Sequence, residues 1–259
     1  MSETGKLIEE LVGIMASLRS ENGCPWDKEQ TRESIKPYLI EEVYEVIKAI
    51  DEKNVDEIKE ELGDLLFQVI FHARIAEENG EFTIDDVMDG IRKKITERHP
   101  HVFGDTKVKD SAEVLVNWEN QKIKENPKRK SILDGVPYNM PALLRAHRLQ
   151  DKASRVGFDW PETSGVMEKV KEELSEIEES LEKSDLESAR AELGDLLFIL
   201  SNLGRFLGCN SEDVLNQTNN KFIRRFHYIE KNLKESGKKL EDVGLAEMDR
   251  FWEEAKDKV

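Results

Sequence analysis

Acidic side chains recur in this sequence at two spacings that suit metal-dependent chemistry. The first motif is Glu-Glu-x-x-Glu, at Glu41, Glu42 and Glu45, and the second is Glu-x-x-Asp, at Glu61 and Asp64. Residues three apart share one face of a helix, so each motif presents its spaced carboxylates together. Converging carboxylates repel one another unless cations neutralise them. Oxygen-only ligands favour Mg²⁺, with Mn²⁺ as a substitute, so the pattern predicts a magnesium site.

The same acidic pattern occurs a second time in the chain. Residues 61–67 read ELGDLLF, and so do residues 192–198, which lie 131 positions later. At this offset the second set of acids is Glu172, Glu173, Glu176, Glu192 and Asp195. We interpret the chain as two homologous domains, 1–125 and 142–259, joined by a linker at 126–141 that is rich in proline.

Each acidic block is expected to form a helical hairpin, because apolar residues recur at helical spacing on both sides of a turn. Asn54 with Glu57 resembles a capping box, and Ser184 with Glu187 repeats it, which places the turns near Lys53 and Ser184. Glu45 and Glu61 are each eight residues from Lys53. In an antiparallel hairpin they therefore lie at the same height, as do Glu42 and Asp64. The alternative is a solvated acidic surface, which a duplicated and level arrangement disfavours.

Glu41 and Glu172 have a less certain role, because each precedes its paired acids by one position. They point about 100° away from that face. They could orient a ligand, bind a second metal ion or activate water, and they could equally be surface acids.

Basic and aromatic residues repeat at matching positions in both halves. Lysine and arginine four apart share a helix face and suit binding of phosphate oxygens, while an indole can stack on a base. The alternative readings are surface cations and tryptophans that anchor a terminal helix. The candidate substrate-binding residues are Lys94, Arg98, Trp118 and Lys122 in the first half, and Lys221, Arg224, Arg225, Trp252 and Lys256 in the second.

The composition favours a helical protein and excludes several partners. The formal net charge is −16, which disfavours nucleic acid and anionic membranes. There are two cysteines, without metal-ligand spacing, and no apolar signal segment, so we expect a cytoplasmic protein. Glycine-rich phosphate loops are absent, so a nucleotide site must be built from side chains and metal.

Several longer motifs resemble one known family. The first half carries GCPWD at 23–27, YLIEEVYE at 38–45, EELGDLLFQV at 60–69 and ERHPHVFGD at 97–105. The second half carries VGFDW at 156–160, KVKEELSE at 169–176, AELGDLLF at 191–198 and NKFIRRF at 220–226. Together they are similar to the MazG family of nucleoside triphosphate pyrophosphohydrolases, in its two-domain form, over nearly the whole chain.

The resemblance implies an all-α fold in which helices from two subunits pack together, and hence a homodimer. It implies hydrolysis of nucleoside triphosphates to monophosphate and pyrophosphate, with broad specificity and a role in cleaning or controlling the nucleotide pool. Eight acids would hold Mg²⁺: Glu42, Glu45, Glu61, Asp64, Glu173, Glu176, Glu192 and Asp195. Lys169, at the start of the second acidic motif, and residues 221–225 with Trp252 would contact the nucleotide.

In the expected chemistry, bound metal neutralises charge on the leaving pyrophosphate, and a carboxylate such as Glu41 or Glu45 orients or deprotonates water. The acids Glu41, Glu42, Glu45, Glu61 and Glu172 are therefore the catalytic candidates. One alternative is a hydrolase with narrow specificity for dUTP or phosphoribosyl-ATP. A second is a di-iron carboxylate bundle, which the second motif disfavours because it is Glu-x-x-Asp without histidine. A third is a non-enzymatic helical scaffold, which would turn over no nucleotide.

Overall fold

The computed structural model describes residues 2–125 and 130–258, and within these ranges it contains helices and no strand. The contacts group the chain into two compact units, 1–108 and 109–259. The first unit contains α1 (Glu3–Leu18), α2 (Pro25–Glu29), α3 (Arg32–Asp51), α4 (Val55–Glu78), α5 (Ile84–Arg98) and α6 (Pro100–Phe103). The second contains α7 (Ser111–Glu125), α8 (Ala142–Ser154), α9 (Thr163–Glu182), α10 (Leu186–Phe206), α11 (Ser211–Glu235), the 3₁₀ turn η1 (Leu240–Asp242) and α12 (Leu245–Lys256). The predicted all-α fold is confirmed.

The boundary between the compact units lies before α7, whereas the sequence places the domain boundary after it. Helix α7 ends at Glu125 and α8 begins at Ala142, so the expected linker at 126–141 falls between these two helices. The two acidic blocks lie in different units on either division.

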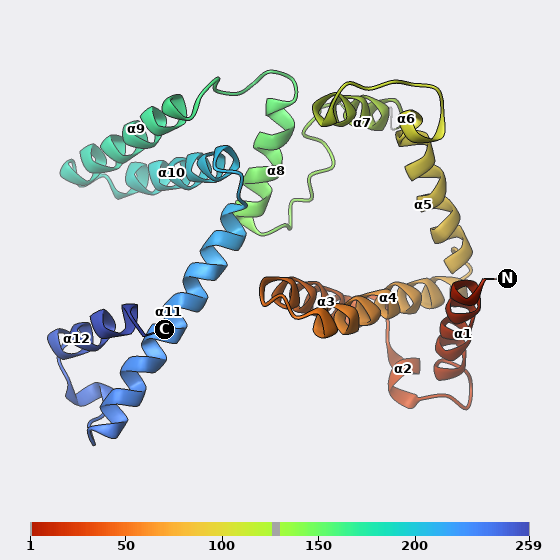
Figure 1. Cartoon of the computed structure of the whole chain (residues 1–259), viewed down its shortest axis with the longest axis horizontal. Coiled ribbons are helices and arrows are strands. Elements are labelled where there is room, and N and C mark those ends of the chain that lie inside the picture. The colour runs from red at the N-terminus through yellow and green to blue at the C-terminus, as the bar shows by residue number, and fades with distance from the viewer. Residues whose placement is uncertain (1, 126–129, 259) are drawn as a thin grey trace. The chain divides into compact units, whose positions relative to one another are not determined.

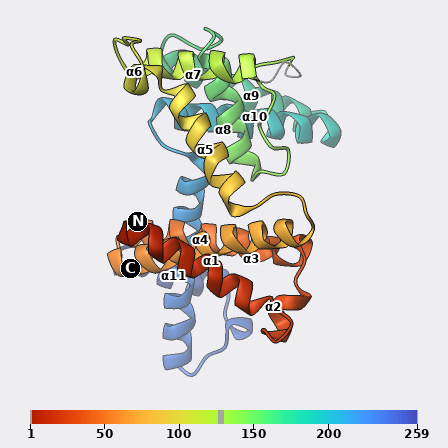
Figure 2. The same cartoon turned by 90° about the vertical axis from the view of Figure 1, so that its right-hand side faces the viewer.

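In the first unit, α3 and α4 form an antiparallel hairpin, and α1 packs on α4 (Figures 1 and 2). The core of this unit forms where these helices meet, around Met15, Ile35, Ile70, Phe71 and Ile75. Because all five side chains are at most 5% exposed, this core fixes the N-terminal half of α3 against the C-terminal half of α4.

In the second unit, α9 and α10 form the corresponding hairpin, and α8 packs on α10 (Figure 1). Val166, Val170 and Ile199 form the core between the hairpin helices. A separate core joins α12 to the long helix α11, through Ile229, Leu233 and Phe251.

The turns of both hairpins have the same backbone construction. Lys53 and Ser184 occupy the left-handed region, with φ of 55° and 57°. Asn54 and Asp185 follow them as N-caps, and their side chains accept from the backbone N–H groups of Glu57 and Ser188. The predicted cap at Asn54 is confirmed. The predicted cap at Ser184 is wrong by one residue, because Ser184 takes the left-handed position that Lys53 takes in the first half.

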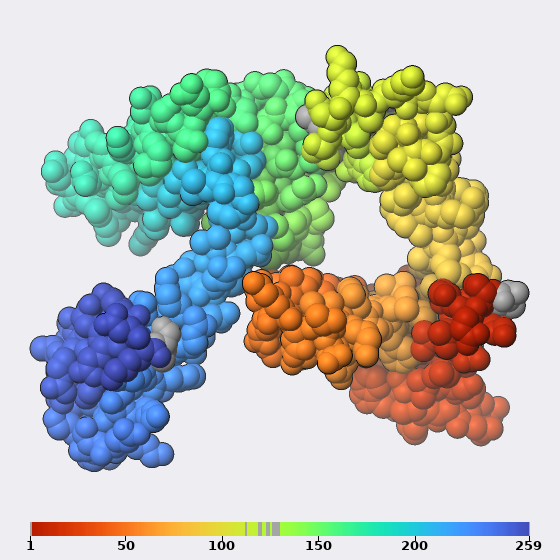
Figure 3. All heavy atoms as spheres, in the orientation of Figure 1, coloured from red at the N-terminus to blue at the C-terminus, as the bar shows by residue number. Residues whose placement is uncertain are grey.

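Each hairpin has a face on which apolar side chains remain exposed. Ile40, Val43, Tyr44 and Ile47 on α3, and Leu62, Leu66 and Val69 on α4, are at least 37% exposed. On α9 and α10 the exposed apolar residues include Leu174, Leu181, Leu193, Leu197 and Leu200, while the positions of Ile40, Tyr44 and Ile47 are taken by Lys171, Ser175 and Glu178. The α3–α4 block appears in orange in the space-filling view (Figure 3). Within the described residues, no helix is long and apolar enough to cross a membrane.

Candidate metal and nucleotide site

The α3–α4 hairpin gathers three of the predicted acids of the first half. Glu42, Glu45 and Glu61 each offer a carboxylate oxygen, and these oxygens lie within 4.8 Å of one another. Two come from one helix and one from the other, as the matching heights of the hairpin predict. Asp64 is exposed and lies outside this group, although it is close enough to act on the charge of two members.

The carboxylates of the first group destabilise one another when they are ionised. Burial raises the pKa of Glu42, and so do the nearby charges of Asp64, Glu45 and Glu61, while a hydrogen bond from Gln68 opposes the shift. Burial also raises the pKa of Glu61, with Glu45 and Asp64 as the next causes. A bound cation would relieve this repulsion, so the group has the electrostatics expected of carboxylates that hold a metal ion.

The α9–α10 hairpin repeats the arrangement with a different surrounding. Glu173, Glu176 and Glu192 have carboxylate oxygens within 4.8 Å of one another. Burial raises the pKa of Glu176, and Glu173 and Glu192 add to the rise. Glu173 itself is buried, and its carboxylate accepts an ion-pairing contact of 2.7 Å from Lys169 Nζ.

Lys169 lies directly at the second acid group, which is where the resemblance places a nucleotide contact. Its ammonium contacts Glu172 at 2.8 Å as well as Glu173. The hydrogen bonds to these two carboxylates raise the pKa of Lys169, so the ammonium stays charged. Glu172, which is outside the group of three, is thereby linked to the site through Lys169. Glu41, its counterpart, is exposed.

Gln68 is a site residue that the analysis of the sequence missed. Its side chain is 9% exposed, and its Nε2 donates to Glu42 Oε1 at 3.4 Å. The sequence does contain a feature that indicates Gln68, because it is a polar residue inside the apolar run LLFQVIF. At the repeat offset the second half has Ile199, so this contact belongs to the first half alone.

The basic residues predicted on α11 form a cluster with α12. Arg225 lies over the ring of Trp252, with 5.5 Å from its Cζ to the ring centroid, and Phe222 lies 5.2 Å from the same ring. The described part of the chain contains no ion pair between Lys221, Arg224 or Arg225 and the acids of α9 and α10.

The other predicted substrate residues have local contacts. Lys94 and Arg98 lie on α5, where the neighbouring Lys93 pairs with Asp89. Lys122 Nζ lies 5.8 Å from the centroid of the Trp118 ring. Lys256 pairs instead with Glu253, so the matching Trp252–Lys256 contact is replaced by that of Trp252 with Arg225.

A cleft of about 430 Å³ opens beside the acids of the second unit. Lys169, Glu173 and Asp195 line it, and so do the aromatic side chains of Phe158 and Trp160. Sites for small molecules typically have volumes of about 300–1,000 Å³, so the cleft is large enough for part of a nucleotide.

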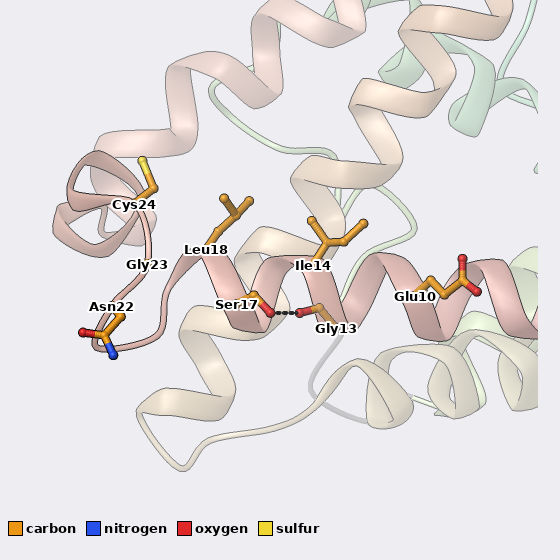
Figure 4. A pocket seen from close by; sticks show the side chains of 8 residues that line it. All are labelled: Glu10, Gly13, Ile14, Ser17, Leu18, Asn22, Gly23 and Cys24. Atoms are coloured by element: carbon orange, nitrogen blue, oxygen red, sulfur yellow. Dashed lines mark hydrogen bonds between the residues drawn. The ribbon is translucent and has the colours of Figure 1, made fainter.

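Another cavity, in the first unit, lies beside α1 and is unrelated to the acid group (Figure 4). Its lining includes Glu10, Ser17 and Cys24, and the Ser17 hydroxyl donates to the carbonyl of Gly13. None of its lining residues belongs to the acid group, so this cavity is separate from the site.

The fold and the paired acid groups define a duplicated all-helical protein with two carboxylate sites. The sequence model of the MazG nucleotide pyrophosphohydrolase domain matches it twice, at residues 30–103 and 162–229. Each match contains one hairpin with its complete set of acids. The chain therefore belongs to the MazG nucleotide pyrophosphohydrolase family, and the family prediction made from its motifs is confirmed.

Two relatives of similar length support the same assignment, and a longer relative is also similar. The chain is 49% identical to a nucleoside triphosphate pyrophosphohydrolase/pyrophosphatase MazG of Thermotoga maritima, over 99% of this chain and 98% of the relative. It is 43% identical to a nucleoside triphosphate pyrophosphohydrolase of Escherichia coli, over 96% of this chain and 97% of the relative. An uncharacterised protein of Bacillus subtilis is 50% identical over 94% of this chain, which covers 50% of that longer relative.

Proposed function

We propose that this enzyme uses Mg²⁺ to hydrolyse nucleoside triphosphates, with broad base specificity, to nucleoside monophosphate and pyrophosphate, and so cleans the cellular nucleotide pool. The observation that carries the proposal is the pair of acid groups, each with three carboxylate oxygens within 4.8 Å. Hydrolysis of nucleoside triphosphates is in keeping with the names of the full-length relatives from Thermotoga maritima and Escherichia coli.

The donor set fits Mg²⁺, with Mn²⁺ as a substitute. Glu42, Glu45 and Glu61 offer oxygen atoms only, and Mg²⁺ is typically held by a few carboxylates together with substrate phosphates. Asp64 and Asp195 are next to the two groups and would complete them. When bound, the metal neutralises negative charge on the triphosphate and on the leaving pyrophosphate.

The chain's own side chains supply orientation and positive charge. Lys169, whose ammonium lies against Glu173, can donate to a phosphate oxygen once cations satisfy the acids. Glu172 accepts from the same ammonium, and we assign it the role of orienting the attacking water. Hydrolysis then needs no covalent intermediate on the protein.

We further propose that the working assembly is a homodimer. The apolar faces of the two hairpins are unpartnered within their units, and a two-helix hairpin cannot bury such a face by itself. A second copy would cover the faces as a four-helix bundle. It would also give the basic cluster of α11, with Lys221 and Arg225, a route to the acids of the partner.

The test is product identity on a panel of ribo- and deoxynucleoside triphosphates, with Mg²⁺ and with chelator. We expect monophosphate and pyrophosphate in equal amounts from several bases, and loss of both in chelator. Release of nucleoside diphosphate and inorganic phosphate would contradict the proposed hydrolysis to monophosphate and pyrophosphate. Turnover of dUTP alone would contradict broad base specificity.

A further inference from the structure

The cleft beside the second acid group has polar groups deep in its wall that the proposed chemistry does not use. Gln150 from α8 and Asn202 from α10 both line it. The two residues are 8% and 3% exposed, so their amides are almost completely removed from bulk water. A buried amide group without a partner costs about 1–3 kcal/mol, so such groups are normally paired.

Each of these amides is held at one end and open at the other. Gln150 Nε2 donates to the carbonyl of Phe198 at 2.7 Å, while its Oε1 has no hydrogen-bond partner among the described residues. Asn202 Oδ1 accepts from Arg205 Nε at 3.0 Å, and no hydrogen bond from its Nδ2 is found within the described ranges. The wall of the cleft therefore includes one amide acceptor and one amide donor without a hydrogen bond among the described residues, each fixed in orientation by its other end.

An aromatic ring is held at the same cleft by a special feature of α9. The Trp160 indole lies so close to Gly165 that a Cβ at that position would be 2.4 Å from Trp160 Cδ1. Glycine in the first turn of α9 thus permits the ring to lie against the helix. A fixed indole beside open hydrogen-bonding groups suits a planar, polar-edged ligand, because aromatic faces stack on heteroaromatic rings.

We propose that this cleft binds the nucleobase of the triphosphate, with Gln150 and Asn202 pairing to its edge and Trp160 stacking on its face. The inference rests on the proposed function, since Glu173 and Asp195 line the same cleft and would lie at the phosphate end. Every common base carries both donors and acceptors on its edges, so one open acceptor and one open donor produce a preference among bases without excluding any.

The test uses the full chain with Glu42→Gln/Glu45→Gln, so that only the second site is read. In this background, kcat/KM is measured for ATP, GTP, CTP and UTP, and for inorganic tripolyphosphate, which has the same anhydride bonds and no base. The variants are Asn202→Leu and Gln150→Met, and Trp26→Phe in the first unit is the matched aromatic control.

We expect Asn202→Leu and Gln150→Met to change the ratios of kcat/KM between bases by about tenfold, with turnover of tripolyphosphate unchanged. Gly165→Ala, which must displace the indole, should lower kcat/KM for all four nucleotides by a similar factor and leave tripolyphosphate unaffected. Equal losses on nucleotides and tripolyphosphate, or unchanged ratios between bases, would overturn the inference while the proposed function stands.

A second measurement does not depend on turnover. Titration with nucleoside monophosphates should quench tryptophan fluorescence, and Trp160→Phe should remove the quench while Trp26→Phe retains it. If the wild type hydrolysed no triphosphate, a quench that requires Trp160 would still support the base site. A quench that persists in Trp160→Phe, or no quench in the wild type, would show that the cleft holds something else, such as a side chain of a second copy.

Discussion

At the scale of single residues, the two halves stabilise the same carboxylate by different means. Glu42 and Glu173 are equivalent by the repeat, but a neutral amide from Gln68 contacts the first and the ammonium of Lys169 contacts the second. At the position of Lys169 the first half has Tyr38. The second site therefore has a cation ready for a phosphate oxygen, and the first site does not have it at that position.

The first residue-scale prediction concerns Gln68. Replacing it by methionine removes the hydrogen bond to Glu42 at similar volume, so Mg²⁺ binding at the first site should weaken by about tenfold or more, as for other groups that orient metal ligands. Mg²⁺ titration in the Glu173→Gln/Glu176→Gln background measures this. Ile199→Met tests the matching position of the second half and should not alter first-site affinity. An unchanged affinity in Gln68→Met would show that Gln68 does not orient Glu42.

A second prediction follows from the raised pKa of Glu61. The metal-free folded state holds this proton more tightly than the unfolded chain, so the group favours folding below its unfolded pKa, near 4.5. That contribution is lost as pH rises through the folded pKa. At pH 7 in chelator, Glu61→Gln should therefore melt at a higher temperature than the wild type.

Metal should reverse this order of melting temperatures. Mg²⁺ at one hundred times its Kd raises the free energy of unfolding by about 2.7 kcal/mol for a single site, which corresponds to a rise in melting temperature of roughly 5–10 °C. In Glu61→Gln the first unit should lose this rise. Glu52→Gln, an exposed acid outside the group, should behave as the wild type. If Glu61→Gln melted no higher than the wild type in chelator, repulsion within the acid group would be excluded.

At the scale of elements, the hairpin turns test the assignment of the caps. Asp185 accepts from the Ser188 N–H, so Asp185→Ala should destabilise the second unit by about 1 kcal/mol, within a range of roughly 0.5–2. Ser184→Ala should have no comparable effect on capping, because Ser184 precedes the N-cap Asp185, and it is Asp185 that accepts from the Ser188 N–H. Denaturant unfolding followed by circular dichroism measures both. A larger loss in Ser184→Ala would restore the cap that the sequence pattern favoured.

At the scale of the whole molecule, the fold and the acids were predictable, and the surroundings of the acids were not. Periodicity and the repeat gave the hairpins, and equal distances from Lys53 brought Glu45 and Glu61 together, because these depend on local helix geometry. Gln68, and the cleft with Gln150 and Asn202, depend on packing between helices that are distant along the chain. The contact of Trp252 with Arg225 also depends on such packing, because the two residues lie on α12 and α11.

Assembly provides the prediction for the molecule as a whole. We expect the wild type to have a mass in solution of about twice the 29.9 kDa of one chain. A charge placed on the apolar face, in Ile47→Glu or Leu66→Glu, should shift it toward the monomer, whereas Val102→Glu, at an exposed site on α6, should not. Light scattering coupled to gel filtration measures this. A monomeric wild type at micromolar concentration would contradict the homodimer.

The most direct test of the central claim is pyrophosphate release from a nucleoside triphosphate with Mg²⁺ in wild type and in acid variants. We expect Glu42→Gln/Glu45→Gln and Glu173→Gln/Glu176→Gln each to abolish the contribution of its own site, and the combined variant to lose activity by at least a hundredfold. Loss in one variant alone would assign turnover to that unit. A combined variant that keeps its folded circular dichroism spectrum and releases pyrophosphate at the wild-type rate would contradict the account.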